Sequence, residues 1–180
     1  MNEKPEPSWA FKLMSMIHDN PLRRKFSNPY STLISAGLKP GQKVLEIGPG
    51  PGFFTIPAAR IVKDTGIVYA IDIHPLAIKK ISERMQKEQI TNVKVYLADA
   101  RNTGLPTDSI DLAFLFGVIH NLDAKFQELL KELDRVLVRN GIIAIQRFRC
   151  SRDELISIMK DHGFSYYRSE KRLFLFTNAN

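Results

Sequence analysis

The feature that most constrains this chain is a glycine-rich turn that directly follows an apolar run. Residues 44–47 read VLEI, and Gly48, Gly50 and Gly52 follow at alternate positions, with a proline between neighbouring glycines. Glycine allows positive φ and removes the β-carbon that would hold a ligand away from the main chain. Because proline has no amide hydrogen, the available donors would be the glycine amides and those that open the next helix. The sequence therefore predicts a strand that runs into a cofactor-binding loop.

The residues around this loop indicate the kind of ligand. Glu46 lies two residues before the first glycine, where a carboxylate would repel phosphates but suit an ammonium or a sulfonium. The glycine spacing is G-x-G-x-G followed by Phe53, whereas dinucleotide sites have G-x-G-x-x-G with close helix packing. Spacing alone is a weak criterion, but the added carboxylate argues against a nicotinamide cofactor.

Two further carboxylates each follow an apolar run. Asp72 ends the run 68–71, and Asp99 ends the run 93–98. In an open parallel sheet these strand ends lie along one edge, where ligands bind. The first acid could accept from both ribose hydroxyls and the second from an adenine amine, although an Asp at such a position is often only a helix cap. Together with Glu46, they indicate an adenosine that carries a cationic tail.

The chain resembles the class I S-adenosylmethionine-dependent methyltransferases over most of its length. Residues 46–52 match the first motif of this family, Asp72 matches its ribose-binding acid, and Asp99 with Ala100 matches its adenine-binding step. The resemblance implies S-adenosylmethionine as the cofactor and methyl transfer as the activity. No metal is predicted to take part.

The second half of the chain is similar to one branch of this family, the ubiquinone/menaquinone-biosynthesis-like methyltransferases. The similar stretches are 110–122 (IDLAFLFGVIHNL) and 130–141 (LKELDRVLVRNG). That branch usually reads L-H-H-x-x-D and then R-V-L-K-P-G-G. This chain departs from it, with His120 and Asn121 at the histidine pair and Arg-Asn-Gly at 139–141.

The resemblance assigns a role to each matched residue. The predicted contacts to the amino-acid part of the cofactor are Glu46, Gly48, Gly50 and Gly52. Asp72 and Ile73 are predicted to contact the ribose, Asp99 and Ala100 the adenine, and Phe116 the face near the sulfonium. Methyl transfer is an in-line displacement, so holding the reactants in line matters most. His120, just beyond the fourth predicted strand, is the candidate general base; its alternative role is capping or packing.

Alternating strand and helix patterns predict one α/β domain over residues 1–180. The predicted elements include strands at 43–47, 141–145, 164–168 and 172–176 and helices at 29–36 and 152–161. The link between the last two strands is so short that they must form an antiparallel hairpin. The resemblance implies a Rossmann-like, mainly parallel seven-stranded sheet with helices on both faces and an antiparallel last strand.

The end of the fourth strand bears on the methyl acceptor. Residues 116–119 read FGVI and contain no Asn-Pro-Pro-Tyr-like turn, which orients a nitrogen acceptor in this superfamily. The first motif is similar to that of ribosomal RNA adenine dimethylases, but their Asn-Leu-Pro-Tyr turn and C-terminal helical domain are missing. A small-molecule O, S or C nucleophile is therefore predicted. The alternatives are an RNA or protein methyltransferase that uses the basic surface, or a non-catalytic cofactor-binding module.

Charge, cysteine content and the N-terminal segment complete the predictions. The net charge of +7 allows nucleic-acid binding, but the basic residues are spread along the chain. The single Cys150 and the lack of a signal peptide or a long apolar run predict a cytoplasmic protein that does not span a membrane. Residues 1–30 predict a helical segment that either covers an acceptor pocket or packs permanently on the core. The oligomeric state stays open.

Overall fold

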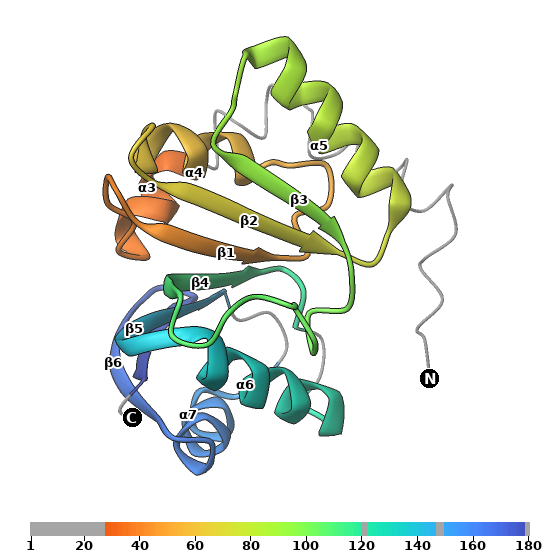
Figure 1. Ribbon diagram of the computed structural model, residues 1–180. Coiled ribbons are helices and arrows are strands. Elements are labelled where there is room, and N and C mark those ends of the chain that lie inside the picture. The colour runs from red at the N-terminus through yellow and green to blue at the C-terminus, as the bar shows by residue number, and fades with distance from the viewer. Residues whose placement is uncertain (1–27, 120–121, 147–149, 179–180) are drawn as a thin grey trace.

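The computed structural model describes residues 28–119, 122–146 and 150–178, and it contains one seven-stranded sheet with helices on both faces (Figure 1). The elements, in chain order, are α3 (Pro29–Ser35), β1 (Lys43–Ile47), α4 (Thr55–Val62), β2 (Ile67–Asp72), α5 (Pro75–Glu88), β3 (Val93–Leu97), β4 (Ile110–Phe116), α6 (Ala124–Val136), β5 (Leu137–Gln146), α7 (Arg152–Asp161), β6 (Phe164–Glu170) and β7 (Leu173–Asn178).

The strand order is β3-β2-β1-β4-β5-β7-β6. Strands β1 to β5 pair in parallel, while β7 is antiparallel to both β5 and β6. The predicted Rossmann-like sheet and its reversed last strand are confirmed. The reversed strand lies one place inside the edge, because residues 173–176 of β7 are apolar and buried whereas residues 165–170 of β6 are exposed.

Alternate side chains of the central strands supply two apolar layers. On one face, Val44 and Leu112 pack with residues of α3 and α4. On the other, Leu45 and Leu115 pack with residues of α6 and α7. Figure 1 shows α3, α4 and α5 on one side of the sheet and α6 and α7 on the other. The near-continuous apolar strands are typical of a parallel sheet covered on both faces.

Two local features differ from the sequence-based predictions. Strand β5 begins at Leu137 rather than at Gly141, and its pairing with β4 shifts register between Ile110 and Leu112. The Arg-Asn-Gly stretch is therefore an irregularity within the strand, and Asn140 there has a φ of 61°. The predicted lid falls mainly on residues 1–27, which lie outside the described residues; Asn28 caps α3 by accepting from the Tyr30 amide. Over the described ranges, no helix is both long and apolar enough to cross a membrane.

Candidate cofactor-binding site

The carboxyl ends of β1 and β2 bring the glycine loop against Asp72. Strand pairing places Ile47 beside Ile71, so the loop begins next to the end of β2. The Asp72 Oδ2 accepts from the Gly50 amide at 3.1 Å, and Oδ1 accepts from the His74 amide at 2.8 Å. Burial raises the pKa of Asp72, and the two amide hydrogen bonds offset part of that rise. The predicted neighbourhood of loop and acid is therefore present.

The loop glycines have the backbone geometry that the sequence predicts. The φ angles of Gly48, Gly50 and Gly52 are 64°, 53° and 80°. A β-carbon on Gly48 would lie only 2.1 Å from Val118 Cγ1, so no larger residue fits there without rearrangement. This close approach holds the loop against the segment that follows β4.

The loop amides, however, are already used within the protein. The Gly48 amide donates to the Ile71 carbonyl at 2.9 Å, and the Gly52 amide donates to the Pro49 carbonyl at 3.0 Å. The Gly50 amide donates to Asp72. The expectation that these three amides are available donors is therefore wrong for this structure, because the tight turn satisfies them internally. The glycines therefore allow a tight turn without β-carbons, but their amide hydrogens are not free to bind a ligand.

Glu46 is the least compensated group at this edge. Its side chain is buried, with the residue only 2% exposed, and its Oε2 has no hydrogen-bond partner among the described residues. The Thr55 Oγ1 at the start of α4 is equally buried and also lacks a partner there. Burial raises the pKa of Glu46 to about 8; the charge of Asp72 adds to the rise, while Thr55 and Arg84 oppose it. Buried polar groups are normally satisfied, so this pair marks a functional-site candidate.

Arg84, which the sequence-based predictions did not include, supports the glycine loop through hydrogen bonds to its carbonyl groups. From α5, its Nη1 donates to the Gly52 carbonyl at 2.7 Å and to the Pro51 carbonyl at 3.2 Å. Its Nη2 lies 3.5 Å from Glu88 Oε1. Its spacing from Ile81 on the inner stripe of α5 was the available signal, because a charged residue there needs a partner.

Asp99 reaches the same sheet edge, but an arginine occupies its carboxylate. The Arg101 side chain donates to both oxygens, and the Arg101 amide donates to Oδ1 at 2.9 Å. These hydrogen bonds lower the pKa of Asp99, whereas its partial burial works in the opposite direction. Ala100 is half-buried beside it. Sequence reasoning placed Asp99 correctly on this edge but gave no role to Arg101.

The remaining predicted residues lie around the same edge. Ile73 is exposed next to Asp72, and the neighbouring Leu97 is 57% exposed. Phe116 is half-buried at the end of β4, with its ring centroid 4.9 Å from that of Phe54, which opens α4 after the loop. His120, the predicted base, lies outside the described residues, so its position stays a prediction.

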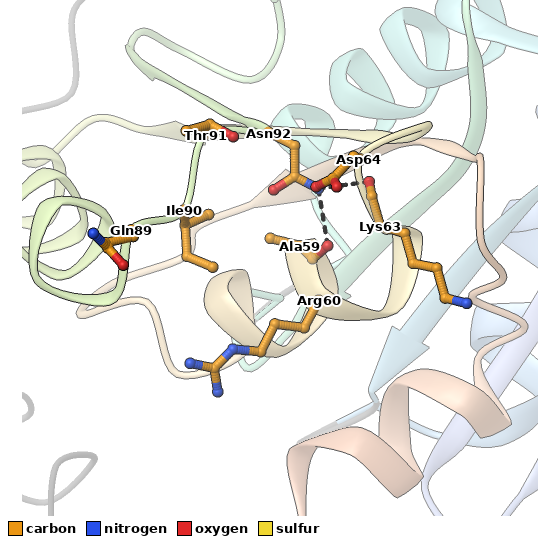
Figure 2. Close-up of a pocket in the computed structure, with 8 residues that line it drawn as sticks. All are labelled: Ala59, Arg60, Lys63, Asp64, Gln89, Ile90, Thr91 and Asn92. Carbon is orange, nitrogen blue, oxygen red and sulfur yellow. Dashed lines mark hydrogen bonds between the residues drawn. The ribbon is translucent and has the colours of Figure 1, made fainter.

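A separate polar cavity of about 300 Å³ lies at the opposite edge of the sheet (Figure 2). It is lined by Ala59, Arg60, Lys63, Asp64, Gln89, Ile90, Thr91 and Asn92. Its polar groups largely serve the scaffold: Asn92 Nδ2 donates to the carbonyls of Ala59 and Lys63, and Arg60 pairs with Glu88. None of the predicted cofactor residues lines this cavity.

The sheet order and the loop–acid edge define a Rossmann-like α/β protein of the methyltransferase type. Residues 38–174 match the family described as "Methyltransferase domain", and the chain belongs to this family. The resemblance to class I S-adenosylmethionine-dependent methyltransferases is thereby confirmed.

Individual relatives agree with this assignment. The chain is 32% identical over 134 residues to a ubiquinone/menaquinone biosynthesis C-methyltransferase of Shewanella pealeana, covering 72% of this chain and 52% of that protein. It is 32% identical over 114 residues to a probable cobalt-precorrin-6B C(15)-methyltransferase of Methanosarcina acetivorans, covering 62% of this chain and 61% of the relative. It thus spans only part of these relatives' length.

A solved structure described as an S-adenosylmethionine-dependent methyltransferase from Aquifex aeolicus is similar over nearly the whole chain. The TM-score is 0.80 at 28% identity, with 97% of this chain and 98% of that chain covered. The fold match therefore extends beyond the matched family segment.

Proposed function

We propose that the chain is an S-adenosylmethionine-dependent methyltransferase that acts on a small-molecule O, S or C nucleophile. The observation that carries the proposal is the buried carboxyl of Glu46 beside the glycine loop and Asp72, because the Oε2 of Glu46 has no hydrogen-bond partner among the described residues. An ammonium group is the natural complement of such a carboxylate, since a buried charge requires a partner. The family membership supports the same conclusion.

The residues at the edge fit the parts of this cofactor. Glu46 would hold the ammonium, and the close backbone at Gly48, Gly50 and Gly52 would let the ligand approach. Asp72 accepts from backbone amides, those of Gly50 and His74 among them, and its remaining lone pairs could accept from ribose hydroxyls. The other predicted contacts are Ile73 to the ribose, Asp99 and Ala100 to the adenine, and Phe116 near the sulfonium.

When bound, the cofactor supplies an electrophilic methyl group on sulfur. The protein's part is to fix the reacting atoms in line and to exclude water, which accounts for most of the advantage in such displacements. The rigid loop, braced by Arg84 and Asp72, serves this purpose. His120 is proposed as the base for acceptors that must lose a proton, and residues 1–30 as a cover over the acceptor.

The acceptor class rests on the relatives' names and on the residues after β4. The similar proteins include C-methyltransferases of small molecules and an arsenite methyltransferase. The FGVI sequence at 116–119 lacks the polar-Pro-Pro-aromatic turn of nitrogen methylation. A cytoplasmic location is part of the proposal, since one cysteine suits a reducing compartment.

The test is ligand binding followed by turnover. S-Adenosylhomocysteine should stabilise the protein by about 2.7 kcal/mol at 100 times its Kd, whereas NAD should have no effect. The variant Asp72→Ala should weaken binding by about 1.5–3 kcal/mol while remaining folded, and Asp64→Ala at the opposite edge should not. A shift with NAD alone would overturn the choice of cofactor.

An acceptor screen that follows S-adenosylhomocysteine release distinguishes the alternative functions. Turnover with small molecules is the expected result. Binding without turnover on any acceptor would favour a non-catalytic module, and steeply salt-dependent methylation of RNA would favour the basic surface as the substrate site.

A further inference from the structure

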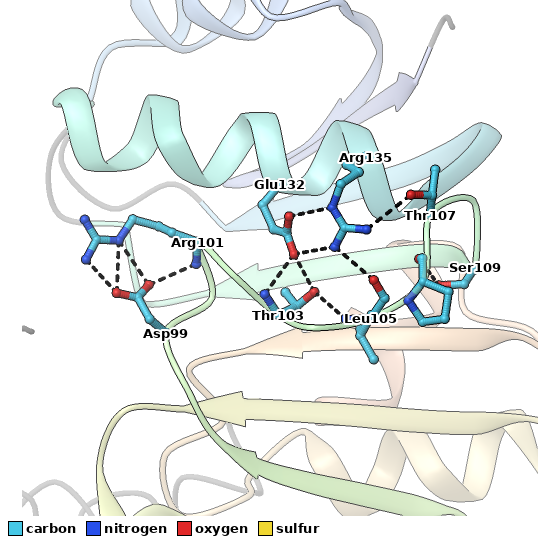
Figure 3. Close-up of polar contacts among 9 residues, drawn as sticks. Asp99, Arg101, Thr103, Leu105, Thr107, Ser109, Glu132 and Arg135 are labelled. Atoms are coloured by element: carbon cyan, nitrogen blue, oxygen red, sulfur yellow. Dashed lines mark hydrogen bonds and ion pairs between the residues drawn. The ribbon is translucent and has the colours of Figure 1, made fainter.

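The carboxylate expected to receive the adenine amine is closed off by a neighbouring side chain. Figure 3 shows Asp99 facing the Arg101 guanidinium. Arg101 Nε lies 3.0 Å from Oδ1 and 3.1 Å from Oδ2, and Nη2 donates to Oδ2. The Arg101 amide adds a fourth contact, to Oδ1 at 2.9 Å.

These contacts engage both oxygens of the group. They come from three N–H groups of Arg101, because the single Nε–H is shared between the two oxygens of a carboxylate that offers about four lone-pair sites. The lowered pKa of Asp99 agrees, because the Arg101 hydrogen bonds stabilise its charged form. An exocyclic amine would therefore compete with the guanidinium for Asp99.

Arg101 contacts a second acceptor at the same time as Asp99. Its Nη1 donates to Glu128 Oε2 on α6 at 2.9 Å, on the side away from Asp99. The side chains of Asp99 and Arg101 are 41% and 23% exposed, so the pair is accessible and of modest strength. Leaving Asp99 would not leave the guanidinium without a partner.

We propose that Arg101 is a latch on the adenine subsite: it competes with the adenine amine for Asp99, and its contact with Glu128, already present beside Asp99, strengthens when Asp99 is released and so favours the open position. This inference rests on the proposed function, because it takes an adenosine ligand at this edge. Arg101 is thus a residue that sets ligand affinity and does not touch the reacting atoms.

The latch has a specific consequence for the reaction. Substrate cofactor and demethylated product carry the same adenine, so opening the latch costs both the same free energy. Both dissociation constants rise together, which shortens product residence without altering the methyl-transfer step.

The test combines one variant with two ligands. The ligands are S-adenosylhomocysteine and its analogue with hydrogen in place of the 6-amino group. Arg101→Gln should bind S-adenosylhomocysteine about two- to fivefold tighter, as expected for release of a partly exposed ion pair. It should bind the analogue with unchanged affinity, because that ligand has no 6-amino group to donate to Asp99.

The matched control is Arg60→Gln. Arg60 also pairs with a glutamate, Glu88, but lies at the opposite edge, and its loss changes the net charge equally. It should alter neither affinity. Equal tightening of both ligands in Arg101→Gln would assign the effect to net charge and overturn the latch, as would unchanged or weaker S-adenosylhomocysteine binding.

A double-mutant cycle with Glu128→Gln tests the open position. Glu128→Gln should weaken S-adenosylhomocysteine binding in the wild-type background and have no effect in the Arg101→Gln background. Equal effects in both backgrounds would contradict the role of Glu128. Wild-type protein that binds neither ligand would instead show that the proposed function is wrong, so the two failures are distinguishable by calorimetric titration.

Discussion

Two buried glutamates, one at the glycine loop and one on α6, differ in the hydrogen-bond partners that the fold gives to the same side chain. Glu46 is 2% exposed and Glu132 is 8% exposed. Glu132 accepts from the Thr103 amide and hydroxyl and from Arg135 Nε and Nη2, at 2.6–2.8 Å (Figure 3). Glu46 Oε2 has no partner among the described residues.

Their pKa values move in opposite directions for this reason. Burial alone would raise the pKa of Glu132, but hydrogen bonds from Arg135 and Thr103 outweigh burial and lower it. At Glu46 burial dominates and raises the pKa to about 8. Burial therefore does not decide the charge of a carboxyl group; its partners do. The satisfied group ties the β3–β4 connection to α6, and the unsatisfied one is the residue proposed to meet a ligand.

The largest loss of stability is expected from breaking the satisfied network. Glu132→Ala leaves Arg135 and the Thr103 amide without their acceptor, and should lower the free energy of unfolding by about 3 kcal/mol, the lower end for a buried ion pair because Arg135 is half-exposed. Urea unfolding measures this. Lys131→Gln, at an exposed position on the same helix, should change it by less than about 0.5 kcal/mol. A similarly small loss for Glu132→Ala would remove the contrast.

The opposite effect is expected at Glu46. A raised pKa means that the folded state favours the neutral acid, so this stability is complete below pH 4.5 and is lost as pH rises through about 8. Glu46→Gln keeps the shape without the charge. It should differ little from wild type at pH 5 and exceed it by up to about 5 kcal/mol at pH 8.5, because the rise of the pKa from 4.5 to about 8 corresponds to about 1.4 kcal/mol per unit.

Urea unfolding of both proteins from pH 5 to 8.5 provides the check. The difference between wild type and Glu46→Gln isolates this group from Asp72, whose pKa is also raised. If the two curves stayed parallel over this range, Glu46 would be charged in the folded protein and the comparison with Glu132 would not hold.

A smaller effect concerns ligand affinity. If Glu46 must ionise to meet an ammonium, binding releases a proton below about pH 8, and the affinity for S-adenosylhomocysteine should rise by up to about tenfold, or 1.4 kcal/mol, per pH unit from 6 to 8. Calorimetry in buffers of different protonation enthalpy would detect the released proton. Glu46→Gln should bind weakly and lose this pH dependence; an unchanged profile in that variant would assign the proton to another group.

The sequence could predict the positions of the Glu46, Asp72 and Asp99 carboxyls but not their partners. Asp72, Asp99 and the glycine loop follow strand patterns that are local in the chain, and the order of elements identified the sheet. The neighbours of each group come from elsewhere: Arg84 is 32 residues from Gly52, and Glu132 is 29 residues from Thr103. Periodicity gives each residue a face, but only tertiary packing decides what lies opposite.

The same reason explains the errors in the site. The free glycine amides were inferred from composition, whereas the turn satisfies them through contacts with Ile71 and Pro49 that only the folded backbone reveals. Arg101 is close to Asp99 in the sequence, but its proposed role as a latch also depends on Glu128, which is distant in the sequence and lies on α6. A carboxyl at a strand end is thus readable from sequence, and its availability is not.

The smallest effect is expected from a substitution of Thr55, which further tests the comparison between Glu46 and Glu132. Its hydroxyl is buried and makes no well-formed hydrogen bond among the described residues, although a weaker interaction with Glu46 remains, so Thr55→Val removes a poorly compensated group while keeping the shape. Stability at pH 5 should stay the same or rise by up to about 1 kcal/mol, measured by urea unfolding. Because this hydroxyl lowers the pKa of Glu46, the variant should also move the alkaline loss of stability to higher pH. Thr55→Ser, which keeps the hydroxyl, should not move it. A loss of more than about 1 kcal/mol in Thr55→Val would mean that the hydroxyl already has a partner, and the loop region would then be satisfied in the same way as the region around Glu132.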